Sequence, residues 1–244
     1  NPLGSELFEL VQPVSVLGGQ DLFQLRRSTL GETLNGLPGV NSTHFGPNAS
    51  RPVIRGLDSD RIRILQNSGA NMDVSGLSND HAVPIDPLTT ERIEVLRGPS
   101  TLLYGSGAVG GVVNVVDNRL PRQLRPASTQ IETRYSSGAD EKTAALAHDG
   151  GQEQIAWHFD GFNRDGSDYD VPRFSNDEGE SSKTLENSWS QSKAVNGGVS
   201  YIGDRGLFGI SIGRLESDYG IPGHHHHEEE HDDEHLHDDD NVFA

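Results

Sequence analysis

Histidine and acidic residues are concentrated near the C-terminal end of this 244-residue chain. The stretch from Gly223 to Asn241 holds nine acidic residues and seven of the chain's 11 histidines, namely His224, His225, His226, His227, His231, His235 and His237. Neutral imidazole is a ligand for zinc, copper, nickel and iron, and carboxylates add oxygen ligands and a field that attracts divalent cations. We therefore predict that this tract captures metal ions, with a merely solvated acidic tract as the alternative. The residues leave the metal open, because flexible nitrogen and oxygen sites bind copper more tightly than zinc.

Composition excludes several other kinds of chemistry. The chain has no Cys, so disulfides, thiolate zinc sites and thiol catalysis are absent. A net charge of −18 argues against nucleic acid as a partner and is compatible with binding cations. The sequence has neither an H-E-x-x-H nor a G-x-S-x-G motif. We therefore do not expect an enzyme.

Residues 1 to about 120 predict a small mixed α/β unit. Strand-forming runs at 10–17, 52–56, 61–65, 91–98 and 112–116 are separated by turns, and helices are expected from Asp21 and over 28–34. Residues 105–110 fit the G-x-G-x-x-G pattern of dinucleotide sites. Such a site needs a helix after the glycines, whereas the β-branched run 112–116 predicts a strand. The glycines are therefore expected to allow a tight turn and close backbone approach.

Residues 127 to 217 alternate between apolar and polar side chains with a period of two. Five strands are predicted, at 129–137, 141–149, 153–163, 191–202 and 206–217. Each is close to the ~9–11 residues that cross a bilayer at a tilt. The second and fourth connections are short, and the third and fifth are long, which is the pattern of short periplasmic turns and long outer loops in outer-membrane barrels. No run approaches the ~18 apolar residues of a membrane helix.

The motifs of the first unit resemble one known family. Ile54-Arg55-Gly56-Leu57, the segment Glu91-Arg92-Ile93-Glu94-Val95-Leu96-Arg97-Gly98-Pro99 and the glycine turn with Val112-Val113-Asn114-Val115 resemble the plug domain of TonB-dependent outer-membrane receptors. The resemblance implies an α+β plug domain over 1–125, followed over 126–244 by the first antiparallel strands of a transmembrane β-barrel that is incomplete in this chain. Since no TonB box or signal peptide precedes Glu6, and family barrels have ~22 strands, we expect a fragment.

The resemblance also implies where the functional residues lie. Residues 218–244 become an extracellular loop, and the stretch that contains Asp80 and His81 becomes a plug loop facing the outside. Asp80 and His81 would supply one oxygen and one nitrogen ligand, and barrel residues would complete a four-coordinate site; the alternative is an ordinary surface loop. Five further residues match plug positions with a structural or gating role, namely Arg55, Gly56, Glu94, Arg97 and Gly98. By contrast, His44, His148 and His158 are isolated, and we expect them on surfaces without a role.

With its His-rich loop, the chain is most similar to the zinc-uptake receptors of the family. The resemblance implies a receptor in the Gram-negative outer membrane, in contact with its lipid, with the plug inside the barrel and the TonB complex of the inner membrane as its partner. Zn²⁺ is the expected transported ligand, and other divalent metals or haem are alternatives. A haem or siderophore-type chelate receptor, or a surface metal buffer without import, remain open.

Overall fold

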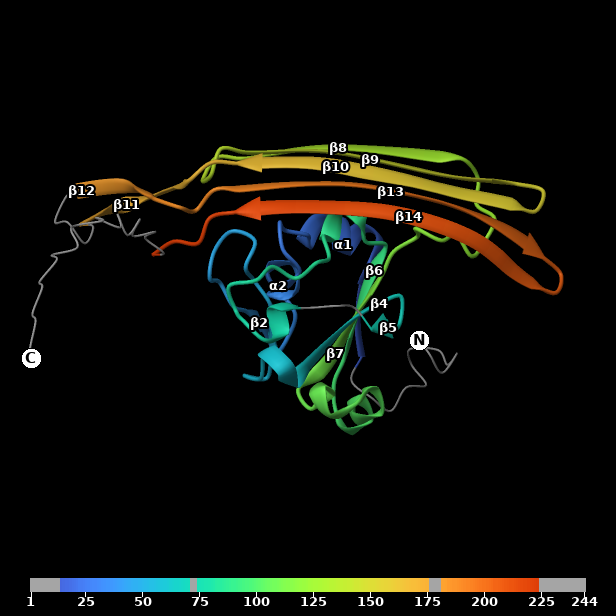
Figure 1. Ribbon diagram of the computed structural model, residues 1–244, viewed down its shortest axis with the longest axis horizontal. Coiled ribbons are helices and arrows are strands. Elements are labelled where there is room, and N and C mark those ends of the chain that lie inside the picture. The colour runs from blue at the N-terminus through green and yellow to red at the C-terminus, as the bar shows by residue number, and fades with distance from the viewer. Residues whose placement is uncertain (1–13, 71–73, 176–180, 224–244) are drawn as a thin grey trace, which may run out of the picture.

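A computed structural model describes residues 14–70, 74–175 and 181–223 of the chain. The described residues form an α+β unit and a long, curved antiparallel sheet that lies across it (Figure 1). We call residues 14–116, which contain the first sheet, the plug unit, and the curved sheet the barrel sheet. No helix among the described residues is long and apolar enough to cross a membrane.

The plug unit is built on a five-stranded sheet with the order β1-β6-β7-β4-β5. Its strands are β1 (Val14–Gly18), β4 (Ile62–Gln66), β5 (Gly69–Ala70), β6 (Arg92–Leu96) and β7 (Gly111–Val116). Strand β7 is central and buried along nearly its whole length, as its β-branched run predicts, and it pairs parallel to β4 and antiparallel to β6. Val113, Val115 and Ile93 are at most 1% exposed, and burial of each such side chain contributes ~1.5–3 kcal/mol. These side chains belong to the main hydrophobic core of the plug unit.

Two short helices and a small hairpin complete the plug unit. Helix α1 (Gly19–Leu25) begins two residues before Asp21, and α2 (Leu30–Leu34) ends before the predicted glycine and proline breakers. The N-cap of α2 is Thr29, whose hydroxyl accepts the Glu32 amide hydrogen bond at 3.3 Å. Ser28 instead donates to Glu141 in the barrel sheet at 2.9 Å. Strand β3 (Pro52–Ile54) pairs with β2 (Val40–Ser42) and does not pair with β4.

The glycine-rich segment is a turn, as predicted, and a strand follows it. The chain passes through the 3-10 helices η5 (Pro99–Tyr104) and η6 (Ser106–Ala108) into β7; the others are η2 (Ser59–Arg61), η3 (Val74–Gly76) and η4 (Pro87–Thr89). Gly111 has φ +155°, and a Cβ there would lie 2.7 Å from Cδ1 of Ile54 and 3.0 Å from the carbonyl oxygen of Leu96. Close packing between neighbouring segments therefore requires glycine here.

The barrel sheet has the order β14-β13-β10-β9-β8, with every pair antiparallel. Its strands are β8 (Ser128–Ser136), β9 (Glu141–Gln152), β10 (Ile155–Gly166), β13 (Ser190–Gly203) and β14 (Gly206–Tyr219), close to the five predicted ranges. The long third connection contains a hairpin that the sequence analysis did not foresee, β11 (Tyr169–Ser175) with β12 (Ser181–Leu185). Strands β8 and β14 are open edges, so the described part of the barrel is not closed.

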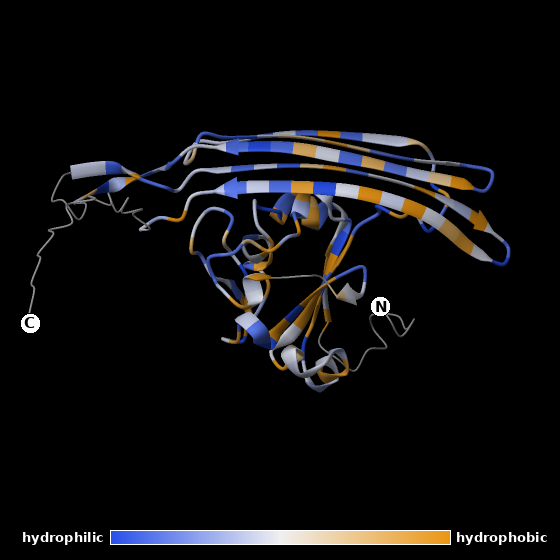
Figure 2. Cartoon of the chain, in the orientation of Figure 1, coloured by the Kyte–Doolittle hydropathy of each residue, from blue (hydrophilic) through white to orange (hydrophobic). Residues whose placement is uncertain are grey.

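The two faces of the barrel sheet differ in polarity, and alternate residues change colour along its strands in Figure 2. The face away from the plug unit exposes large apolar side chains, namely Ile131, Tyr135, Leu146, Ile155, Phe159, Val195, Val199, Tyr201, Phe208, Ile210 and Ile212. The face toward the plug unit buries polar side chains, namely Thr143, His158, Asp160, Arg164, Ser192, Asn196 and Ser200. Apolar-out and polar-in alternation is that of a membrane barrel wall.

Candidate metal site at the plug surface

Asp80 and His81 lie on a turn of the plug unit that follows η3. His81 is exposed, and Asp80 is half-buried. The carboxylate of Asp80 accepts a hydrogen bond from the hydroxyl of Ser78, and the His81 amide donates to the Ser78 carbonyl at 3.3 Å. The turn is thus closed by local hydrogen bonds, with the imidazole on its exposed side.

The last residue of β14 holds this turn from the barrel side. The hydroxyl of Tyr219 accepts a hydrogen bond from the Ala82 amide at 2.8 Å and donates one to the Asp80 carbonyl at 3.0 Å. Tyr219 is five residues before His224, the first histidine of the C-terminal tract. The end of the strand that leads to the tract therefore contacts the turn that carries Asp80 and His81.

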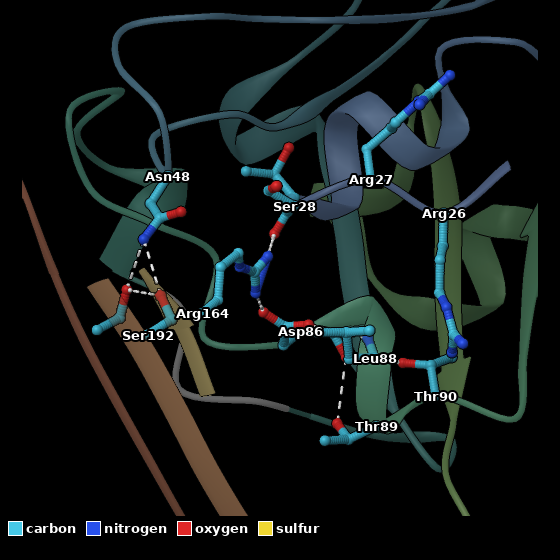
Figure 3. A network of polar contacts seen from close by, with 12 residues as sticks. Arg26, Arg27, Ser28, Asn48, Asp86, Leu88, Thr89, Thr90, Arg164 and Ser192 are labelled. Atoms are coloured by element: carbon cyan, nitrogen blue, oxygen red, sulfur yellow. Dashed lines mark hydrogen bonds and ion pairs between the residues drawn. The ribbon is translucent and has the colours of Figure 1, made fainter. Parts of the chain in front are cut away.

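A cavity of about 360 Å³ lies between this part of the plug unit and strands β13 and β14. His81 and Tyr219 contribute to its wall, and so do hydroxyl and amide side chains, namely Ser28, Thr29, Asn48, Ser50, Ser192 and Ser217. Asn48 donates from the plug unit to Ser192 at 3.0 Å and to Ser217 at 2.9 Å (Figure 3). The lining offers oxygen atoms that suit a hydrated cation or a polar chelate.

A buried ion pair joins the plug unit to the barrel sheet beside the same cavity. Arg164 of β10 is 2% exposed and forms a salt bridge with Asp86, which is 8% exposed (Figure 3). Its second terminal nitrogen donates to the Ser28 carbonyl at 2.7 Å. Burial raises the pKa of Asp86, while Arg164 and the amide of Leu88 act in the opposite direction. The sequence analysis missed this pair, because its members are 78 residues apart.

His158 is a correction to the sequence analysis, which expected an isolated surface residue. It is 8% exposed and faces the plug unit from β10. Its Nδ1 lies 2.8 Å from Asp149 and its Nε2 lies 2.7 Å from Asp160. Asn196 donates to Asp160 at 2.8 Å, and Asn118 also donates to Asp149. Both ring nitrogens thus contact carboxylates, which makes this cluster a polar contact between the wall and the segment that follows β7.

Glu94 and Arg97 make their described contacts inside the plug unit. Glu94 is 5% exposed on β6 and accepts hydrogen bonds from Arg92 at 2.9 Å and Asn114 at 3.0 Å. Burial acts to raise the pKa of Glu94, but the bonds from Asn114 and Arg92 outweigh it and lower that pKa below its ordinary value. Arg97 donates to Ser15 at 2.9 Å, and burial lowers its pKa. These contacts are compatible with the predicted structural role.

The remaining three predicted plug residues share an unusual backbone conformation with a positive φ angle. Arg55, Gly56 and Gly98 have φ of +52°, +80° and +97°, a region that favours glycine. The exposed Arg55 donates its amide to the Gly39 carbonyl at 2.9 Å. A gating role for these residues stays a prediction.

The predicted metal ligands fall into two groups, one outside the described residues and one within them. The seven tract histidines, His224 to His227, His231, His235 and His237, lie outside the described residues. Within the described ranges, no group of three or more His, Asp or Glu side chains is arranged to hold a metal ion. Asp80 and His81 therefore provide two neighbouring donors, and a complete site would need ligands from elsewhere.

Comparison with known proteins agrees with this architecture. Residues 6–112 match the family model of the TonB-dependent Receptor Plug Domain. The copper transporter OprC superposes with a TM-score of 0.66 at 21% identity, over 81% of this chain and 29% of that chain. The siderophore receptor PirA from Acinetobacter baumannii superposes with a TM-score of 0.62 at 22% identity, over 85% of this chain and 32% of that chain. The FrpB iron transporter from Neisseria meningitidis superposes with a TM-score of 0.65 at 14% identity, over 84% of this chain and 31% of that chain.

Together these findings define a TonB-dependent receptor plug domain followed by antiparallel strands of an unclosed barrel, which confirms the predicted fold class. Receptors with this plug domain are outer-membrane proteins that carry the plug inside the barrel, which confirms the predicted outer-membrane location. The extracellular placement of residues 218–244 stays a prediction. The chain spans 29% to 32% of the length of the three structures named above.

Proposed function

We propose that this chain is part of a TonB-dependent outer-membrane receptor that imports a divalent metal ion, with zinc as its cargo. The observation that carries the proposal is the position of Asp80 and His81. They lie on a turn beside a polar cavity, held by Tyr219 at the strand end that leads to the His-rich tract. The tract would concentrate the ion outside the cell and pass it to this turn.

The ligand chemistry is compatible with zinc. Zn²⁺ takes imidazole nitrogen and carboxylate oxygen, and sites that exchange their ligand keep an open position. His81 and Asp80 supply one of each, and the tract or barrel strands beyond β14 would supply the rest. Other divalent metals share these ligands, so geometry and availability would set the selectivity. Energy for release into the periplasm would come through TonB, as in the family that the plug domain matches.

Uptake of radioactive zinc by cells that express the full-length receptor tests this function. His81→Ala should reduce uptake strongly, and so should replacement of the seven tract histidines by asparagine. His148→Ala is the matched control, because His148 pairs with Thr129 on an exposed part of the barrel sheet, at 2.9 Å. Normal uptake by both the His81 variant and the tract variant would refute zinc import through these residues.

A receptor for a metal chelate of the siderophore type is the second candidate. It is favoured by the absence, within the described ranges, of three metal-ligating side chains around one point. It also agrees with the fold shared with the siderophore receptor PirA. In that case the cavity would bind the organic part of the chelate through its hydroxyl and amide groups. Uptake of a ferric chelate that zinc does not inhibit would favour this candidate over zinc import.

A further inference from the structure

Tyr219 forms hydrogen bonds with the backbone on both sides of His81. Its single hydroxyl group accepts from the amide of the residue after His81 and donates to the carbonyl of the residue before it. With one donor and two acceptor positions, a tyrosine hydroxyl can make both bonds at once. The two bonds therefore fix the direction of the peptide segment from which the imidazole projects.

The tyrosine is itself held in place by the barrel sheet and the plug unit. The amide of the next residue, Gly220, donates to the Trp189 carbonyl at 3.0 Å, and the side chain of Asn187 donates to the Ile221 carbonyl at 3.2 Å. On the plug side, a Cβ added to Gly46 would lie 3.0 Å from the carbonyl oxygen of Gly220. The strand end is thus packed between the wall and the plug unit, and the hydroxyl has a defined position.

His81 lies on a short turn at the wall of the cavity, so the freedom of this turn affects how well the imidazole can bind a metal ion. His81 and Tyr219 both contribute to its wall, yet His81 is exposed. An exposed ligand on a short turn loses conformational freedom when it binds metal, and a turn already fixed by tertiary contacts loses less. A hydroxyl group that fixes this turn would therefore reduce the entropic cost of binding a metal there.

We propose that Tyr219 is a positioning residue for a divalent cation site on the Asp80–Ala82 turn. The inference rests on the proposed function, since it assumes that His81 binds the imported ion. It adds that the barrel strand, through one hydroxyl group, sets the affinity and geometry of that site. Tyr219 does not contact the ion, and its effect passes through the backbone of the turn.

The test compares purified full-length receptors that carry Tyr219→Phe, Tyr201→Phe or His81→Ala. Tyr201→Phe is the matched control, because it removes the same hydroxyl from a ring on the apolar outer face. Zinc affinity is measured by chelator competition at less than one ion per protein, so that the tightest site is filled. The absorption spectrum with Co²⁺ in place of zinc then reports the coordination geometry.

We expect Tyr219→Phe to weaken zinc affinity about tenfold, the lower end of the effect of removing groups that orient a metal ligand. The Co²⁺ spectrum should change with it, while the affinity and spectrum of Tyr201→Phe stay as in the parent. An unchanged affinity and Co²⁺ spectrum in Tyr219→Phe, with a clear loss in His81→Ala, would overturn the positioning role alone. An unchanged affinity in His81→Ala would instead overturn the metal site of the proposed function.

Discussion

The salt bridge between Arg164 and Asp86 is predicted to be an electrostatic anchor of the plug unit on the described part of the barrel wall. Replacing Arg164 with Met keeps most of the side-chain volume but leaves the carboxylate of Asp86 buried without its cation. Both side chains are less than 9% exposed, so solvent screens the pair little. Breaking a buried pair by removing one partner costs ~3–5 kcal/mol.

Amide hydrogen exchange in the full-length receptor measures this cost. The segment that follows Asp86, through η4 and β6, should exchange more than about 100-fold faster in Arg164→Met, since ~1.4 kcal/mol corresponds to a factor of ten. The double variant Arg164→Met with Asp86→Asn should recover much of the protection, because the buried charge is then gone. Arg214→Met is the control. The Arg214 side chain is 81% exposed where it pairs with Glu216, so its replacement should have no measurable effect. Equal exchange in Arg164→Met and the parent would refute the anchor.

Three further predictions concern the plug unit and its contact with the wall. Gly111→Ala should destabilise the plug unit by ~1–3 kcal/mol, because its Cβ would meet Ile54; thermal unfolding should show no such loss for Gly36→Ala, where the space is open. Glu94 has a lowered pKa in the folded state, so its stabilising effect is complete above its unfolded value of about 4.5 and is lost as pH falls through the lower folded value. Glu94→Gln should therefore flatten the dependence of unfolding free energy on pH below about 4.5, and an unchanged slope would count against that shift. His158→Leu should cost ~1–3 kcal/mol of stability, because it removes the hydrogen bonds of the imidazole to Asp149 and Asp160 and leaves each of these carboxylates with one asparagine donor. A neutral effect in thermal melts would contradict that role.

Local sequence patterns predicted most of the barrel sheet and the centre of the plug unit. Alternation placed all five strands within three residues at either end, because apolar and polar faces meet different surroundings on the two sides of a wall. The β-branched run after the glycines predicted β7, because a strand that is buried on both faces is apolar along nearly its whole length. Helix α2 begins two residues after the predicted start at 28, because Thr29 is its N-cap and Ser28 is engaged in a tertiary contact with Glu141.

The contacts around the candidate site were out of reach of sequence reasoning. Tyr219 and Ala82 are 137 residues apart, and Arg164 and Asp86 are 78 apart. Nothing local to either member indicates its partner, since each pair forms only when a barrel strand is placed against the plug unit. His158 is a different case, because both of its carboxylate partners lie within the barrel sheet. Asp160 is two residues further along β10, and Asp149 lies directly opposite on β9. A polar residue on the inward face of a predicted strand was the available signal.

The binding of zinc at the Asp80–Ala82 turn is the central claim, and anomalous diffraction at the zinc absorption edge tests it most directly. Crystals of the full-length receptor grown with zinc at neutral pH should show a peak ~2.0–2.2 Å from an imidazole nitrogen of His81 and a carboxylate oxygen of Asp80. A peak confined to the histidines of residues 224–237, with none at this turn, would contradict the claim.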